Sequence, residues 1–170
     1  IQVGGRNLVK NSKIPSTPNT VFTDSVKGQV RMGTTNPVYW LNSITTPFSA
    51  GEIVTFSISC RRISGSGIIR MYLNPNNHYV SLGTVGTEWV TLRLTRTINI
   101  GVGLSDTLHI DGIPTSGLLI EWIKLEIGKK ATDWTPAPED VKAEIDIAAV
   151  AAHSAAETNA LAQANIADTN

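Results

Sequence analysis

Aromatic and guanidinium side chains recur at even spacing in two short segments of this sequence. Arg70 and Tyr72 share the polar face of one alternating run, and Trp89 and Arg93 share the polar face of another. Aromatic rings stack on the flat C–H faces of sugar rings, and guanidinium groups donate paired hydrogen bonds to hydroxyl groups. If the two strands are neighbours in one sheet, these four side chains form a patch suited to binding a saccharide.

Four other residues extend this set of candidates. His78 and Tyr79 follow a strong turn signal and would border the patch, whereas Tyr39 and Trp40 follow an Asn-Pro pair and would supply a loop platform. The candidate carbohydrate-binding residues are therefore Arg70, Tyr72, Trp89, Arg93, Trp40, Tyr39, His78 and Tyr79. Each of these aromatic residues has a structural alternative, because it can also pack against the core or be an ordinary exposed strand residue.

Catalytic and metal-binding chemistry has little support in the sequence. His109 and Asp111 form too short a fragment to indicate a metal site without a further His or Cys at useful spacing, so we expect them on a surface strand. Glycoside hydrolysis needs two carboxylates across a cleft, but Glu126 is expected to pair with a lysine or a backbone donor. A structural calcium ion is an alternative for a sandwich module, but no ordered series of calcium ligands indicates one. We therefore expect no enzyme activity, no cofactor and no metal.

Strict alternation of apolar and polar residues predicts strands in the first 135 residues. The clearest runs are Glu52–Cys60, Ile68–Leu73, Trp89–Arg96 and Leu118–Ile127, with turn signals between them. The lone Cys60 lies on an apolar face, which predicts a buried and inert thiol. Many short strands with no amphipathic helix among them predict an antiparallel β-sandwich of the jelly-roll type.

The composition changes abruptly after this region. Residues 136–138 form a proline linker, and residues 139–170 are rich in Ala and contain no Gly, Pro or aromatic residue, which predicts a long helix. Alternating steps of four and three place a heptad seam on that helix, which suggests a coiled coil. The seam consists of Val141, Ile145, Ala148, Ala152, Ala155, Asn159, Ala162 and Ile166. A solvated, Ala-rich spacer is the alternative.

Charge divides between the same two parts of the chain. Residues 1–138 contain thirteen Lys or Arg and eight Asp or Glu, a balance of +5, whereas residues 139–170 contain one Lys and six Asp or Glu, a balance of −5. The positive excess is too weak and too scattered to indicate a nucleic-acid partner. No apolar run is long enough to predict a membrane span. The chain begins at Ile1 without Met, so we expect it to be part of a longer polypeptide.

Two motifs at the ends of the predicted sandwich carry a resemblance to a known family. Residues 5–12 read GRNLVKNS, and residues 123–140 read IKLEIGKKATDWTPAPED. Both resemble motifs of the carbohydrate-binding-module-like jelly-roll domains in tail and baseplate (receptor-binding) proteins of phages that infect Gram-positive bacteria. The resemblance spans essentially the whole chain, although its specific motifs lie only at the ends.

The resemblance implies a virion protein that binds host cell-wall polysaccharide without catalysis. It also implies assembly with other tail proteins and a homo-oligomer, expected to be a trimer through residues 141–166. The alternative within the same family is a structural spacer without sugar affinity. In the end motifs, Asn7 and Asn11 are expected to bond to backbone at the entry, and Trp134 is expected to anchor the exit to the sandwich.

Overall fold

The computed structural model of this chain forms two compact units, Ile1–Ala137 and Pro138–Asn170. Within these units, the structure describes residues 5–10, 12, 21–23, 29–31, 40–73, 76–103, 107–114 and 116–168.

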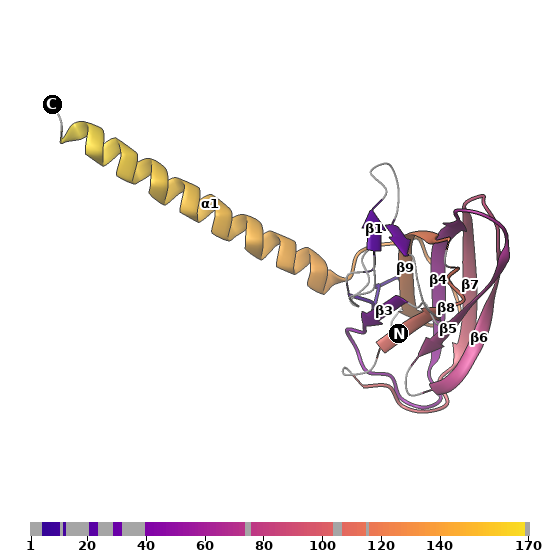
Figure 1. Ribbon diagram of the computed structural model, residues 1–170. Helices are drawn as coiled ribbons and strands as arrows, with labels where there is room; N and C mark the ends of the chain where they lie inside the picture. Colours follow the sequence, from indigo (N-terminus) through magenta and orange to yellow (C-terminus); the bar gives the residue numbers. More distant parts are fainter. Residues whose placement is uncertain are drawn as a thin grey trace. The chain divides into compact units, whose positions relative to one another are not determined.

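The first unit is a sandwich of two antiparallel sheets (Figure 1). The five-stranded sheet has the order β1 (Val21–Thr23), β2 (Gln29–Arg31), β9 (Leu118–Ile127), β4 (Ile53–Arg62) and β7 (Val90–Thr97). The four-stranded sheet has the order β3 (Trp40–Ser43), β8 (Thr107–Asp111), β5 (Gly67–Leu73) and β6 (Asn76–Val85). The predicted antiparallel sandwich is confirmed, with strands in all four of the clearest alternating runs.

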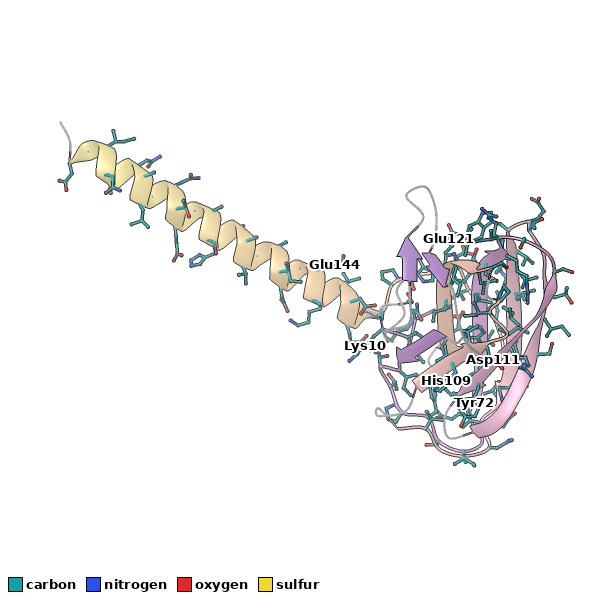
Figure 2. The ribbon with its side chains drawn as sticks, viewed as in Figure 1. Lys10, Tyr72, His109, Asp111, Glu121 and Glu144 are labelled. Carbon is teal, nitrogen blue, oxygen red and sulfur yellow. The ribbon has the colours of Figure 1, made fainter. Side chains whose placement is uncertain are left out.

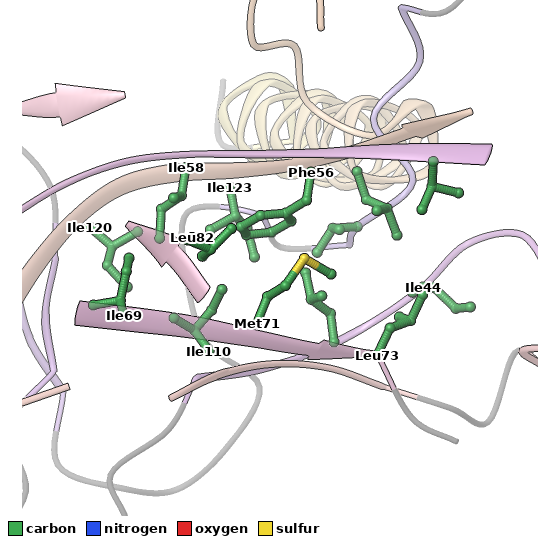
Figure 3. Packing of buried hydrophobic residues seen from close by; sticks show 14 of the residues in the cluster. Ile44, Phe56, Ile58, Ile69, Met71, Leu73, Leu82, Ile110, Ile120 and Ile123 are labelled. Carbon is green, nitrogen blue, oxygen red and sulfur yellow. The ribbon is translucent and has the colours of Figure 1, made fainter. Parts of the chain in front are cut away.

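The core lies between the two sheets and is built from the apolar half of each alternation. Phe56 and Ile58 on β4 face Ile69 and Met71 on β5, and all four are completely buried (Figure 3). Cys60 is buried in the same layer, and this burial raises the pKa of its thiol to about 12. Because only the thiolate is a strong nucleophile, the thiol is inert near neutral pH, as the sequence predicts.

A bulge in β9 changes which residues reach this core. Ser59 on β4 lies opposite Trp122, but the next pair in the ladder uses Ile120, so Glu121 is an extra residue. Ile120 and Ile123 are three residues apart and both belong to the core cluster, whereas a regular strand points such residues to opposite faces. The displaced Glu121 carboxylate accepts a hydrogen bond from the Ser59 hydroxyl at 2.9 Å.

The second unit is the helix α1 (Pro138–Ala167), which confirms the predicted helix. Proline is favourable in the first turn, where its missing N–H has no helical partner, and Glu139 and Asp140 add negative charge at the same end. No residue of α1 is buried. The described residues contain no helix with the length and hydropathy needed to cross a bilayer.

Candidate functional site

The outer face of β5 presents the first pair of predicted binding residues. Ile69 and Met71 point into the core, whereas Ile68 is 55% exposed and the side chain of Arg70 is 49% exposed. Tyr72 is half-buried on the same outer face. The alternation in the sequence therefore places Arg70 and Tyr72 together, as predicted, on the face of the four-stranded sheet that looks away from the core.

Strand β8 lies beside β5 and completes this group. Arg70 lies opposite Asp111 and donates from Nη2 to its Oδ2 at 2.6 Å, and Tyr72 lies opposite His109 with ring centroids 5.1 Å apart at 78°. Figure 2 shows Tyr72, His109 and Asp111 together on this sheet. We call these four residues the outer-face cluster.

His109 and Asp111 are members that the sequence reasoning assigned only to a surface strand. The signal for their place is the same two-residue spacing that links Arg70 to Tyr72, because His109 and Asp111 must also share one face of their strand. The sequence does not show that β8 lies beside β5, since 34 residues separate Leu73 from Leu108, its partner in the ladder. Their contribution depends on that long-range pairing.

Each member of the cluster is oriented by a neighbour. The Asp111 carboxylate accepts from Arg70 and, through Oδ1, from the backbone N–H of Gly112 at 2.5 Å. Burial lowers the pKa of His109, so its imidazole is neutral near pH 7 and offers one donor and one acceptor. The cluster thus presents an aromatic ring, a neutral imidazole and a half-exposed arginine side chain, which suit a neutral polar ligand more than acid–base chemistry.

The described part of the chain contains no group of three or more His, Cys, Asp or Glu side chains arranged to hold a metal ion. The His109 and Asp111 fragment therefore has no third ligand of these types among those residues. Arg70 already occupies one carboxylate oxygen of Asp111.

The second predicted pair lies in the other sheet, so the expectation of one joint patch is wrong. Trp89 directly precedes β7, and Arg93 lies within it opposite Ser57 of β4. Because β7 belongs to the five-stranded sheet and β5 to the four-stranded sheet, their outward side chains are on opposite sides of the sandwich. Trp89 is half-buried, and the guanidinium carbon of Arg61 is 5.7 Å from the centroid of its ring.

In the five-stranded sheet, the outer face of β9 is covered near Lys124 and Glu126 by the segment that follows this strand. Lys124 and Glu126 point outward from β9, yet both side chains are 0% exposed. Lys124 Nζ donates to Thr132 Oγ1 at 2.7 Å and to the Asp133 carbonyl at 2.5 Å. Glu126 accepts from the Thr132 backbone N–H at 3.0 Å and from its hydroxyl at 2.7 Å. We call residues 129–137 the exit segment.

The predicted partners of Glu126, a lysine and a backbone donor, are therefore both confirmed. The two charged groups lie 3.7 Å apart, and Thr132 bonds to both. A buried ion pair is tolerated when hydrogen bonds satisfy its remaining polar atoms, and the exit segment supplies those bonds.

Asn7 joins both ends of the sandwich. Its side-chain oxygen accepts from the backbone of Val9 and Leu125 at 3.1 and 3.3 Å, and its amide donates to the carbonyls of Ile123 and Thr135 at 3.2 and 3.0 Å. The predicted bonding of Asn7 to backbone is confirmed, and it extends far beyond the local turn. Asn11 lies outside the described residues.

Trp134 ties the exit segment to the entry of the chain. Its indole Nε1 donates to the Ser12 hydroxyl at 3.1 Å, and the ring is half-buried. Thr135 adds a hydrogen bond from its hydroxyl to the Gly5 carbonyl at 3.2 Å. These contacts give Trp134 the anchoring role that the sequence predicts.

For four of the eight predicted binding residues, the structure does not describe the side chain. Trp40 begins β3, and His78 and Tyr79 belong to β6, but their side chains lie outside the described part of the structure. Tyr39 lies outside the described residues altogether. These four residues remain predictions.

No protein-family model matches this sequence, and no curated protein matches it. The fold is similar to that of several solved structures. The CBM22-1 and GH10 modules of xylanase 10B from Clostridium thermocellum, complexed with xylohexaose, match with a TM-score of 0.52 and 9% identity over 77% of this chain and 30% of that chain. The C-terminal CBM6 of the laminarinase LamC from Zobellia galactanivorans matches with a TM-score of 0.45 and 15% identity over 70% of this chain and 96% of that chain.

A carbohydrate-binding module of lichenase 5A from Cellvibrio mixtus, in complex with cellotriose, also matches, with a TM-score of 0.41 and 13% identity over 76% of this chain and 98% of that chain. At such identities the similarity concerns the fold alone. The statement about the fold rests on the xylanase match, because its TM-score exceeds 0.5. A shared fold does not fix a ligand. Residues 5–137 of this chain thus include a β-sandwich that is structurally similar to carbohydrate-binding modules.

Proposed function

We propose that this chain is a non-catalytic adhesion module of a phage tail or baseplate protein that binds host cell-wall polysaccharide. The observation that carries this proposal is the outer-face cluster, which lies on the exposed face of a sandwich with the fold of carbohydrate-binding modules. The proposal places the sugar against Tyr72 and His109, with Arg70 beside them.

The chemistry of the cluster matches what a sugar ring requires. The half-buried ring of Tyr72 offers apolar surface for stacking on C–H groups, and its edge contact with His109 limits its rotation. The ion pair with Asp111 holds the guanidinium of Arg70, whose side chain is 49% exposed. Groups that are ordered before binding lose less entropy when a ligand arrives, so this arrangement favours affinity for a polar ring.

The phage setting of the proposal is supported by the two end motifs and by α1. Single saccharide sites bind weakly, and linking several copies raises the overall affinity without new contacts. A homo-oligomer through the seam of residues 141–166, which the resemblance implies to be a trimer, would provide such linkage. A location in the virion, with the module facing the host surface, follows from the same proposal.

Binding of the full chain to cell walls purified from Gram-positive bacteria tests this function. We expect the chain to sediment with the walls and Tyr72→Ala to weaken binding by about tenfold or more, as loss of a central aromatic contact commonly does. Trp89→Ala is the matched control, because it removes an aromatic residue from the opposite side of the sandwich. If no cell wall or soluble glycan binds, or if both variants bind as the parent does, the proposed site is wrong.

The second candidate function is a structural spacer without sugar affinity. It is favoured by α1, a helix of 30 residues with none buried, since such an element has no other evident use than spacing or assembly. A spacer predicts a stable oligomer that binds neither cell walls nor glycans. The sedimentation experiment therefore separates the two functions, because the adhesion module requires binding and the spacer requires its absence.

A further inference from the structure

A charged side chain is buried at one end of the sandwich without a counter-charge. Arg62 is the last residue of β4, and only 9% of it is exposed. None of the ion pairs among the described residues includes Arg62. Arginine stays charged in proteins, and a buried charge is unfavourable unless it is paired and hydrogen-bonded. Within the described part of the chain, Arg62 therefore lacks the anionic partner that its burial requires.

The guanidinium of Arg62 also has few hydrogen bonds. It lies two residues after Cys60 on the inward face of β4 and reaches the end of the opposite sheet, where its Nη2 donates to the Gly112 carbonyl at 3.1 Å. A guanidinium has five N–H donors, and this bond uses one of them. Its Nε is buried and has no partner. Such atoms are rare in folded proteins, and each of them requires an explanation.

A glycine leaves the space that this guanidinium occupies. A Cβ on Gly67 would lie 2.6 Å from Nη2 and 3.2 Å from Nη1 of Arg62, so a larger residue there would displace the group. Gly112, which accepts the hydrogen bond, has a φ of +81°, a conformation that favours glycine. The end of the Arg62 side chain thus lies against backbone where β5 begins and β8 has just ended.

We infer that Arg62 forms an oxyanion site, which takes a phosphate or carboxylate group of a ligand. Guanidinium groups bind both kinds of oxyanion through charge-assisted hydrogen bonds. The next four residues, 63–66, are all exposed, so this end of β4 lies at the surface and a small anion has access to the exposed part of Arg62. The site is distinct from the outer-face cluster, whose Arg70 points away from the core and is already paired with Asp111.

Titration of the full chain with inorganic phosphate and with acetate tests this inference, which does not depend on saccharide binding. Ionic strength is held constant with sodium chloride. We expect the Nε–H signal of Arg62 in ¹⁵N NMR spectra, identified by its absence in Arg62→Met, to shift saturably with at least one of the two anions. The same anion should raise the denaturant concentration at the midpoint of unfolding, since a ligand that binds only the folded chain stabilises it.

Arg62→Met should abolish that anion-dependent rise, because methionine is long and apolar but has no charge. Arg61→Met is the matched control. It makes the same change one residue earlier, on the opposite face of β4 and beside the ring of Trp89, so it should keep the full response.

Gly67→Ala tests the site without removing the charge. The added methyl group should displace the end of the Arg62 side chain and raise the anion concentration at half-saturation by about tenfold, as loss of one charge-assisted hydrogen bond commonly does. This variant also decides the matter if Arg62→Met fails to fold, which circular dichroism shows.

Three results would overturn the inference. The first is that neither phosphate nor acetate shifts the Arg62 signal more than chloride does, which would leave Arg62 only a link between the two sheets. The second is that Arg61→Met loses the response as fully as Arg62→Met, and the third is an unchanged half-saturation in Gly67→Ala. Either of these two results would place the bound anion away from Arg62.

Discussion

The two outer faces of the sandwich both carry charged residues, but these residues are buried on one face and partly exposed on the other. On the five-stranded sheet, Lys124 and Glu126 are completely buried beneath the exit segment. On the four-stranded sheet, Arg70 keeps half of its side chain in solvent although it is paired with Asp111. The covered face thus uses its charges to hold the chain together, whereas the open face presents an oriented charge to its surroundings.

This difference separates a structural role from a binding role for residues that alternation alone makes equivalent. Lys124 and Arg70 both point outward from central positions of their strands. Burial of a charge is unfavourable unless hydrogen bonds replace water, and Thr132 and the Asp133 carbonyl supply those bonds to Lys124. We therefore expect substitutions of the residues buried beneath the exit segment to alter stability, and those of the outer-face cluster to alter binding.

The largest expected effect is a loss of stability when Glu126 is replaced. Glu126→Ala leaves the buried ammonium of Lys124 without its counter-charge and leaves both donors of Thr132 unpaired. Removal of one partner from a buried ion pair costs about 3–5 kcal/mol. Chemical denaturation followed by tryptophan fluorescence measures this change in the free energy of unfolding.

Glu88→Ala is the matched control for that experiment, because it makes the same change of charge at an exposed position. An exposed site away from specific contacts usually changes stability by less than about 0.5 kcal/mol. If the two variants unfold at the same denaturant concentration, the covered face does not hold the sandwich together and the contrast between the faces is lost.

Arg70→Ala should have a smaller effect on stability and a larger effect on binding. The side chain of Asp111 is 11% exposed and keeps the Gly112 N–H as a partner, so loss of the half-exposed Arg70 should cost about 1–3 kcal/mol, less than loss of Glu126. Loss of the guanidinium should nevertheless weaken binding to cell walls by about tenfold, since a well-placed hydrogen-bond donor contributes about 1–2 kcal/mol. Sedimentation with cell walls and denaturation of the same preparation measure both quantities.

Arg93→Ala removes an exposed arginine from the other sheet and is the control for Arg70→Ala. It should change neither stability nor binding appreciably. A loss of binding in Arg93→Ala equal to that in Arg70→Ala would mean that the ligand contacts the five-stranded sheet, and the assignment of the open face would then fail.

The faces of individual strands were predictable from sequence, but their neighbours were not. Period-two alternation correctly placed Arg70 with Tyr72, and turn residues and prolines located the strands and the helix. Alternation does not show that β5 pairs with β8 and not with β7, because strand order depends on contacts between residues far apart in the chain. For that reason the sequence does not place His109 and Asp111 beside Arg70 and Tyr72, and it does not show that Trp89 lies in the other sheet.

The sequence also does not predict that the exit segment covers Lys124 and Glu126. Lys124 and Glu126 occupy polar positions of an alternating strand, which usually indicates exposure to water. Their burial comes from the exit segment, whose path over β9 is fixed by Thr132, by Trp134 and by the contacts of Asn7 with both ends of the sandwich. The end motifs predicted some of these bonds, but not that they close over a charged pair.

The smallest expected effect is a dependence of stability on pH that comes from His109. Burial lowers the pKa of His109 below its ordinary value of 6.5, so the folded chain binds fewer protons at this site than the unfolded chain does. Stability from this group is therefore fully present above pH 6.5 and is lost as the pH falls from there to the pKa of the folded state. Since the site is only partly buried, the change should be modest.

His109→Gln isolates this contribution, because glutamine keeps a polar group on the open face and does not titrate. The difference in unfolding free energy between the two chains should stay constant above pH 6.5 and should move in favour of the variant below it. His153 of α1, which lies 3.2 Å from Glu157, is present in both chains, so any contribution that it makes to the unfolding free energy is absent from the difference. A difference that is flat across this range would show that the pKa of His109 is the same in the folded and the unfolded chain, and burial would then not hold this imidazole neutral beside Tyr72.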